Sequence, residues 1–296
     1  MAGRCKKIFN KIRNSYENKV HSFIHSFYLV WVIFIVFATI FGVSKVNLKY
    51  NQIKGEISIL NDKVENQQRM INILNNTIMS LETKNRFSIN CTDERFNYLA
   101  IGNSITKHGV CDYWRSESGM AASKPINDYF NVHNQLFRNN GYDVHSCAIN
   151  FGEWEYLSHD RSQAIGIING YLNSNIDLIT VQLGENVSNL STFESDFIYL
   201  LDYLKSRCPK AKIIVIGDFW LNDGLRNDMK YRACSDTSCV FIDLSAISGK
   251  EEYKCGMNTS VYDNIGQVHL VQHAGVAEHP NDKAMKFIAE KIFLRY

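Results

Sequence analysis

The chain has 296 residues, of which 45% are hydrophobic and 12% aromatic, and its formal net charge at pH 7 is +2. This length and apolar content allow one good-sized domain with a buried core and additional segments. The basic residues are dispersed except at the extreme N-terminus, so the charge pattern excludes a nucleic-acid-binding surface and indicates no polyanionic partner.

An uncharged apolar run, residues 27–43, follows a basic N-terminal segment. The run is long enough to cross a bilayer as a helix. Because basic residues outnumber acidic ones before it, the positive-inside rule places residues 1–20 in the cytosol. We expect a cytosolic tail over 1–20, a transmembrane signal anchor over 21–44, and a type II single-pass protein whose remaining part is periplasmic or extracellular. A signal peptide cleaved near Gly42-Val43-Ser44 is the alternative.

Residues 45–85 predict a coiled-coil stalk, because apolar positions are spaced alternately by four and three. β-Branched residues at a and leucines at d favour a parallel homodimer, although Tyr50 and Ile53 fit a trimer as well. An amphipathic helix packed on its own domain is the alternative. The positions that form this seam are Val46, Tyr50, Ile53, Ile57, Leu60, Val64, Gln67, Ile71, Leu74, Ile78 and Leu81.

Seven of the eight cysteines follow the apolar run, and the eighth is Cys5. In an oxidising compartment these residues predict disulfides, with Cys234 able to bridge to Cys239 and Cys91 able to cross-link a dimer. An odd number leaves at least one thiol free or bonded to another chain. No Cys or His cluster has zinc-like spacing, so we expect neither a metal nor a cofactor.

Strand-like and helix-like segments alternate over residues 93–296, which predicts one domain with a parallel sheet covered by helices on both faces. The expected strands are Tyr98–Ile101, Asp143–Ile149, Asp177–Leu183, Lys212–Ile216 and Cys239–Leu244. The expected helices are Pro125–Asn139, Ser158–Leu172, Thr192–Ser206, Asn222–Cys234 and Asn281–Phe293. The segment Lys107–Lys124 is expected to form a loop or small hairpin over the site.

Four polar points follow strands or open the last helix, where open α/β sheets place their sites. Ser104 follows the first strand and His279 precedes the last helix. A serine hydroxyl needs a base to become a nucleophile, and histidine has the pKa that suits that role. The backbone N–H groups of Ser104 and Gly152 and the side-chain amide of Asn186 are candidate oxyanion donors.

These four blocks resemble those of the SGNH (GDSL-type) hydrolase family, and a membrane-anchored bacterial member is indicated. The matching segments, in order, are Gly102-Asn103-Ser104, Asn150-Phe151-Gly152, Gly184-Glu185-Asn186 and His279-Pro280. The resemblance implies a flavodoxin-like three-layer α/β/α sandwich. It also implies ester hydrolysis or acyl transfer, often on acylated glycans or lipids.

Two positions depart from the family pattern. The family has an aspartate three residues before the histidine, where this chain has Val276, and an aspartate after the asparagine, where it has Val187. The missing acid leaves three possibilities: a Ser-His dyad, a histidine held by a backbone carbonyl, or a substitute carboxylate such as Glu278.

Each candidate residue also has a simpler interpretation. Ser104 could cap a helix. Asn186 lies in a glycosylation sequon, and a glycan there would remove the oxyanion donor, which favours a bacterial periplasmic setting. Three residues after the fourth strand, Asp218, Trp220 and Asp223, could line the pocket or serve as a helix cap and packed aromatic. His108 and His273 are expected at the surface or behind the site.

The sequence therefore predicts a membrane-anchored serine esterase that removes acyl groups, such as O-acetyl groups, from a glycan or another ester substrate. An O-acyltransferase of a surface polysaccharide stays open, because both reactions pass through an acyl-enzyme. A noncatalytic glycan-binding protein also stays open, because Val276 stands where the acid belongs.

Overall fold

The computed structural model describes the backbone of residues 2–157 and 160–296, and the side chains of residues 26–64, 67–68, 71, 86–157 and 160–296. The chain divides into two compact units, Met1–Asn75 and Asn76–Tyr296. We call the second the globular unit. The side chains of the predicted cytosolic tail, and those of the seam positions Leu74, Ile78 and Leu81, lie outside the described residues.

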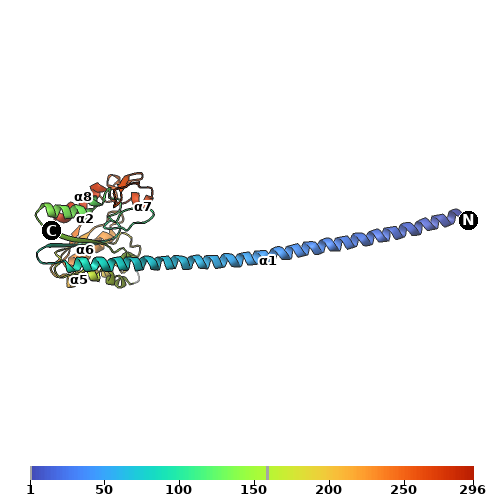
Figure 1. The fold of residues 1–296 in the computed structure, drawn as a ribbon, viewed down its shortest axis with the longest axis horizontal. Helices are drawn as coiled ribbons and strands as arrows, with labels where there is room; N and C mark the ends of the chain where they lie inside the picture. Colours follow the sequence, from blue (N-terminus) through green and yellow to red (C-terminus); the bar gives the residue numbers. More distant parts are fainter. Residues whose placement is uncertain (1, 158–159) are drawn as a thin grey trace. The chain divides into compact units, whose positions relative to one another are not determined.

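Helix α1 runs from Ala2 to Ile89 and is continuous through the apolar run and the predicted stalk (Figure 1). Its segment Ser26–Val64 is long and apolar enough to cross a membrane, and its apolar stretch is exposed. An N-terminal signal sequence meets the same criteria. A span is therefore possible by length and composition, while the orientation, the coiled coil and the homodimer stay predictions.

The globular unit is built on a parallel sheet of five strands in the order β2-β1-β3-β4-β5. This order is that of the flavodoxin-like doubly wound fold, whose switch point lies between β1 and β3. All seven residues of β1 are buried, which suits a central strand covered on both faces. The strands are β1 Phe96–Gly102, β2 Val144–Asn150, β3 Leu178–Gln182, β4 Lys212–Ile216 and β5 Val240–Ile242.

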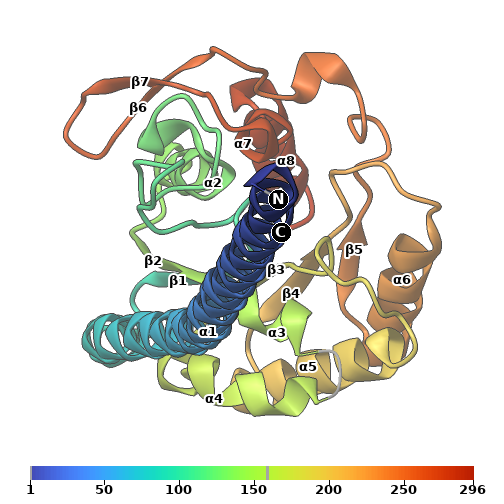
Figure 2. The same cartoon turned by 90° about the vertical axis from the view of Figure 1, so that its right-hand side faces the viewer.

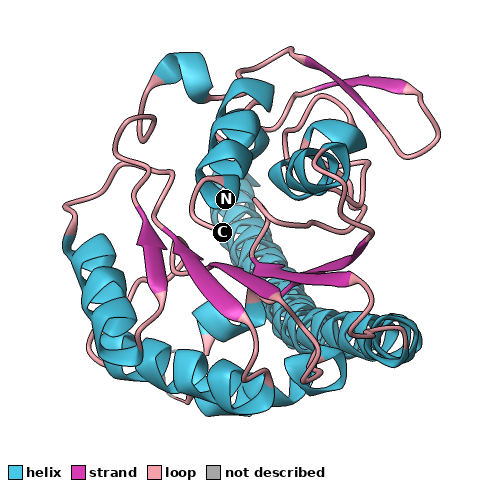
Figure 3. Ribbon diagram, turned by 90° about the vertical axis from the view of Figure 1, so that its left-hand side faces the viewer, coloured by secondary structure: helices cyan, strands magenta, loops and turns pink. Residues whose placement is uncertain are grey.

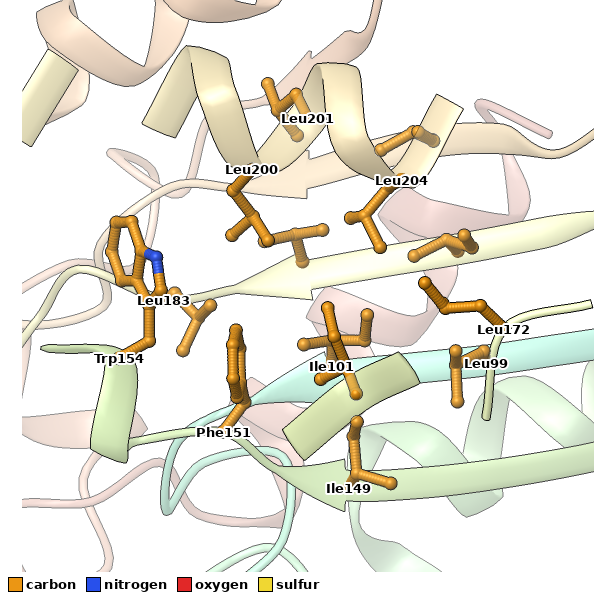
Figure 4. Close-up of a cluster of buried hydrophobic side chains, with 14 of the residues drawn as sticks. Leu99, Ile101, Ile149, Phe151, Trp154, Leu172, Leu183, Leu200, Leu201 and Leu204 are labelled. Carbon is orange, nitrogen blue, oxygen red and sulfur yellow. The ribbon is translucent and has the colours of Figure 1, made fainter. Parts of the chain in front are cut away.

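Helices cover both faces of this sheet, so the predicted three-layer α/β/α architecture is confirmed (Figures 2 and 3). Helices α2 (Tyr129–Asn139) and α8 (Asp282–Phe293) pack on one face. Helices α5 (Phe193–Arg207) and α6 (Leu225–Thr237) pack on the other. Leucines of α5 face the sheet residues Leu99 and Ile101 in the core of that second layer (Figure 4).

The predicted helix Ser158–Leu172 is wrong. Its described part is a chain of short turns: a 3-10 helix Arg161–Ala164, α4 Ile165–Ile168 and a 3-10 helix Asn169–Tyr171. Gly166 and Gly170 explain the difference, because glycine disfavours continuous helix. Helix α6 begins at Leu225 rather than Asn222, since Gly224 takes a left-handed conformation with φ +82°.

Several short elements were not predicted. They include α3 (Glu153–Tyr156), α7 (Ala274–Ala277), the 3-10 helix Glu251–Tyr253, and a hairpin of β6 (Ser260–Tyr262) with β7 (Val268–Leu270). A 3-10 turn, Pro125–Asn127, precedes α2, and the Asp128 carboxylate caps that helix by accepting from the Asn131 N–H. Elements this short carry no periodicity that a sequence pattern could reveal.

The core of the globular unit begins before residue 93. Phe87, near the end of α1, is buried and stacks on the His145 ring at 4.9 Å between centroids. The Asn173 side chain donates to the Ser88 carbonyl at 2.9 Å. The last turn of α1 therefore belongs to the folded unit.

The seven cysteines from Cys91 onward are all free thiols, so the predicted disulfides, Cys234 with Cys239 included, are not supported. Four of them, Cys91, Cys147, Cys208 and Cys234, are buried. Burial raises the pKa of the Cys91 and Cys234 thiols to about 12 and those of Cys147 and Cys208 to about 11. These thiols behave as small core side chains.

Candidate active site

Ser104 lies on the tight turn that leaves the carboxyl end of β1. A side chain at Gly102 would place its Cβ 1.9 Å from the Thr106 hydroxyl oxygen and 2.8 Å from the Gln182 carbonyl oxygen, so the turn requires glycine. The Asn103 side-chain oxygen accepts from the Ile105 N–H at 3.0 Å and closes the turn around Ser104. This local geometry presents the serine at the sheet edge.

The structure brings Ser104 and His279 together across 175 positions of sequence, with 2.8 Å between Oγ and Nε2. On its other side the imidazole Nδ1 is 2.7 Å from the Gly275 carbonyl oxygen. A carbonyl oxygen only accepts, so Nδ1 carries the proton and Nε2 is the acceptor for the serine hydroxyl. The arrangement presents the tautomer that a general base needs.

The environment of His279 favours its neutral form. The residue is 7% exposed, and burial lowers its pKa to about 4, with His108 and His273 lowering it further and the Gly275 contact opposing them. The edge of the Trp220 ring meets the imidazole at 4.9 Å between centroids. The imidazole is therefore held in place by packing as well as by its two hydrogen bonds.

The position at which the family has its acid is occupied here by a buried apolar side chain. Val276 is 1% exposed and belongs to an apolar cluster with Trp114, Met120 and Val271. Glu278 does not replace the acid, because its carboxylate is 2.7 Å from the Lys254 ammonium and 55% exposed. Of the three replacements considered, the geometry shows a histidine held by a backbone carbonyl.

The candidate oxyanion donors lie around the same edge. Among the described residues, none accepts from the Ser104 N–H. The Gly152 N–H donates to the Asn150 side-chain oxygen at 2.8 Å, so an oxyanion would have to share this donor. The Asn186 amide nitrogen donates to Glu155 at 2.7 Å with one of its hydrogens.

Two buried glutamates at this edge were missed by sequence reasoning. Glu155, on α3, accepts hydrogen bonds from the turns after β1 and β3. Glu185 accepts from the N–H groups of Phe219 and Trp220 at 2.8 and 3.0 Å and so fixes the loop that packs on His279. Burial, then the charge of Asp218, raises the pKa of Glu185 to about 8. The sequence signal that could have indicated them is their position, because Glu185 lies inside the third block and Glu155 shortly after the second.

The other candidates have structural partners. Asp218 forms buried ion pairs with Lys230 at 2.6 Å and Arg226 at 2.5 Å, rather than lining the pocket or capping a helix. The Asp223 carboxylate accepts from the Leu225 N–H at 3.2 Å, as a helix cap does. His273 stacks on Tyr113 at 4.6 Å between centroids. Within the described residues, no His, Cys, Asp or Glu group of three or more could hold a metal ion.

The strand order is the flavodoxin-like one, and the four blocks meet at the carboxyl edge of the sheet beside the switch point. The globular unit has a flavodoxin-like three-layer α/β/α fold. Ser104 and Asn186 follow β1 and β3, the two strands that flank the switch point, as this fold requires.

No protein-family model and no curated protein matches the chain significantly. Several solved structures of esterases and lipases do. The psychrotrophic esterase EstA from Pseudoalteromonas sp. is 11% identical, with 67% of this chain and 94% of that chain covered and a TM-score of 0.42. A GDSL-like lipase from Bacteroides uniformis is 18% identical, with 68% and 95% covered and a TM-score of 0.45. A family two carbohydrate esterase from Clostridium thermocellum, in complex with cellohexaose, is 15% identical, with 68% and 63% covered and a TM-score of 0.41.

Proposed function

We propose that this protein is a serine esterase in which Ser104 is the nucleophile and His279 the base. The observation that carries the proposal is the continuous hydrogen-bond chain from the Ser104 hydroxyl through the imidazole to the Gly275 carbonyl, at 2.8 and 2.7 Å. A helix cap or a packed core histidine would not need this order of donor and acceptor. The chain is the minimum machinery for nucleophilic catalysis by serine.

In the proposed reaction, Nε2 of His279 takes the hydroxyl proton while Oγ of Ser104 attacks the ester carbonyl carbon. The tetrahedral oxyanion accepts from the Ser104 N–H and the Asn186 amide, with Gly152 as a shared donor. The imidazolium then gives its proton to the departing alcohol oxygen, which leaves the acyl group on Ser104. Water, deprotonated by the same nitrogen, releases the acid and restores the serine.

We propose an acylated glycan as the substrate class and a membrane-anchored location for the enzyme. Exposed tyrosine rings, Tyr113 and Tyr156, lie near one another beside the site and offer the amphipathic surface that sugar rings favour. The exposed apolar stretch of α1 would hold the enzyme in a bilayer as a type II protein. Both proposals rest on exposed aromatic or apolar side chains that do not pack in the core of the globular unit.

The test is hydrolysis of p-nitrophenyl acetate by the full-length protein in detergent, with fluorophosphonate labelling read by mass spectrometry. We expect Ser104→Ala and His279→Ala each to lower kcat by on the order of 10³-fold or more, because neither partner acts alone. Label should map to Ser104 and vanish in its variant. Thermal unfolding of both variants serves as the control for folding.

The outcomes separate the rival functions. A kcat close to that of the wild type in either variant contradicts the mechanism. A folded protein with neither turnover nor label would overturn the esterase and favour glycan binding. Label without hydrolysis, but with transfer of acetyl to an added polysaccharide, would favour the acyltransferase.

A further inference from the structure

We propose that Glu155 is a positioning residue that orients the Asn186 amide as an oxyanion donor. The proposal rests on the proposed esterase function and deepens it, because it assigns a role to a carboxylate outside the four blocks. Glu155 lies on the one-turn helix α3 and is 2% exposed. A carboxylate buried this deeply is expensive unless its acceptors are used.

The two carboxylate oxygens have separate partners. Oε1 accepts from the Gly184 N–H at 2.5 Å, the Asn103 amide at 3.1 Å and the Asn186 N–H at 3.4 Å. Oε2 accepts from the Asn186 side-chain amide at 2.7 Å. Glu155 thus joins the turn after β1, which carries Ser104, to the turn after β3, which carries Asn186.

The contact at Oε2 determines which way the Asn186 amide faces. The terminal torsion of asparagine is broad, so an unrestrained amide can exchange its nitrogen and oxygen. An acceptor on one hydrogen of Nδ2 selects the orientation in which the nitrogen lies at the site. The second hydrogen of the same nitrogen then remains for an oxyanion, because no other described residue accepts from it.

The backbone of this turn is held by the same residue. Gly184 has φ +114°, and a Cβ there would lie 2.8 Å from the Lys230 side chain, so the turn depends on glycine and on its hydrogen bond to Oε1. Val187, which follows Asn186, is buried and cannot orient an amide. Among the described residues, Glu155 is therefore the side chain that orients Asn186.

The separation of the two oxygens makes the proposal testable by Glu155→Gln. A glutamine with its oxygen at the Oε1 position keeps the three contacts there. Its NH₂ group would then face the NH₂ group of Asn186, two donors in opposition, so the amide loses its fixed direction. The matched control is Glu153→Gln, on the same helix but exposed.

We would measure kcat and KM for p-nitrophenyl acetate with the full-length wild type, Glu155→Gln, Asn186→Ala, the double variant and Glu153→Gln. Asn186→Ala should lower kcat by about 10²- to 10³-fold, as loss of one oxyanion donor does. Glu155→Gln should approach that loss with KM little changed, and the double variant should be no slower than Asn186→Ala. Glu153→Gln should match the wild type.

Unchanged kcat in Glu155→Gln, or losses that multiply in the double variant, would overturn the proposal while leaving the esterase intact. An absence of turnover by the folded wild type would overturn the esterase and this proposal together. If Glu155→Gln does not fold, Glu155→Asp replaces it. That variant keeps the carboxylate but withdraws it from Asn186 by one methylene, and it should show the same lack of additivity.

Discussion

At the scale of single residues, the unusual feature is that Nδ1 of His279 donates to an uncharged carbonyl oxygen rather than to a carboxylate. The Gly275 carbonyl fixes the tautomer as a carboxylate would, but it offers no full negative charge to the imidazolium. Burial then lowers the pKa of His279 to about 4. The proposed base therefore stays neutral in mildly acidic solution and is harder to protonate during the proposed reaction.

This environment predicts an unusual pH dependence. We expect kcat/KM to stay constant well below pH 6.5 and to fall only near pH 4, because the free enzyme loses activity when His279 is protonated. The measurement is a pH-rate profile of p-nitrophenyl acetate hydrolysis between about pH 3.5 and about pH 8, a range that includes the ordinary histidine pKa of about 6.5. An acidic limb centred near pH 6.5 would contradict the lowered pKa of His279 or its role as the base.

Stability should depend on the same group with a known sign. The pKa of His279 is lower in the folded protein than the usual value of 6.5, so below that value the unfolded chain binds the additional proton. The contribution of the neutral imidazole is present above pH 6.5 and declines as the pH falls toward 4. Urea unfolding of the wild type and His279→Gln at pH 7 and about 5 would measure the difference between them.

At the scale of elements, α7 and the apolar cluster beneath it determine where the histidine lies. Val276 points into that cluster from the helix that also supplies the Gly275 carbonyl. A carboxylate at position 276 would be buried among Trp114, Met120 and Val271 rather than directed at the imidazole. The packing of this element therefore excludes the ordinary triad acid.

We predict that Val276→Asp will not create a triad. It should lower the free energy of unfolding by several kcal/mol, because it buries an unpaired charge, while Val276→Ala should cost about 2 kcal/mol through lost apolar contact. Thermal and urea unfolding would measure both effects, and esterase assays would follow kcat. A folded Val276→Asp protein with raised kcat would show that the cluster can open toward His279.

At the scale of the whole molecule, α1 has apolar side chains that its own unit leaves exposed. Ile57, Leu60 and Val64 lie on the predicted seam, and Ile59 is equally exposed but off the seam. A large exposed apolar stripe on a long helix is a surface for another helix. The homodimer stays a prediction, and Ile59 supplies the off-seam control for its test.

We predict that the full-length protein is a dimer in detergent and that Ile57→Asn with Val64→Asn makes it a monomer. Both substitutions place a polar amide at a positions of the seam, where they remove apolar contacts between helices. Ile59→Asn should leave the dimer unchanged. Sedimentation of the three proteins is the measurement, and a trimer, or equal effects of seam and off-seam variants, would contradict the parallel dimer.

The sequence by itself determined the α/β class, the positions of the five strands of the parallel sheet, and the long helix, because each has a strong apolar pattern over enough residues. It also indicated Ser104 and His279, which the structure places 2.8 Å apart. Turn-rich segments, such as residues 160–172, were not predictable, because short elements form only when the rest of the fold packs against them.

Only the tertiary structure decided what surrounds the dyad. The Gly275 carbonyl at His279, the separate contacts of the two Glu155 oxygens, and the free state of Cys234 and Cys239 all involve distances between atoms. A carbonyl group has no sequence signature, since every residue has one. A buried glutamate looks the same in a sequence as an exposed one. Packing alone determines which of them faces the site, and it therefore determines the proposed chemistry.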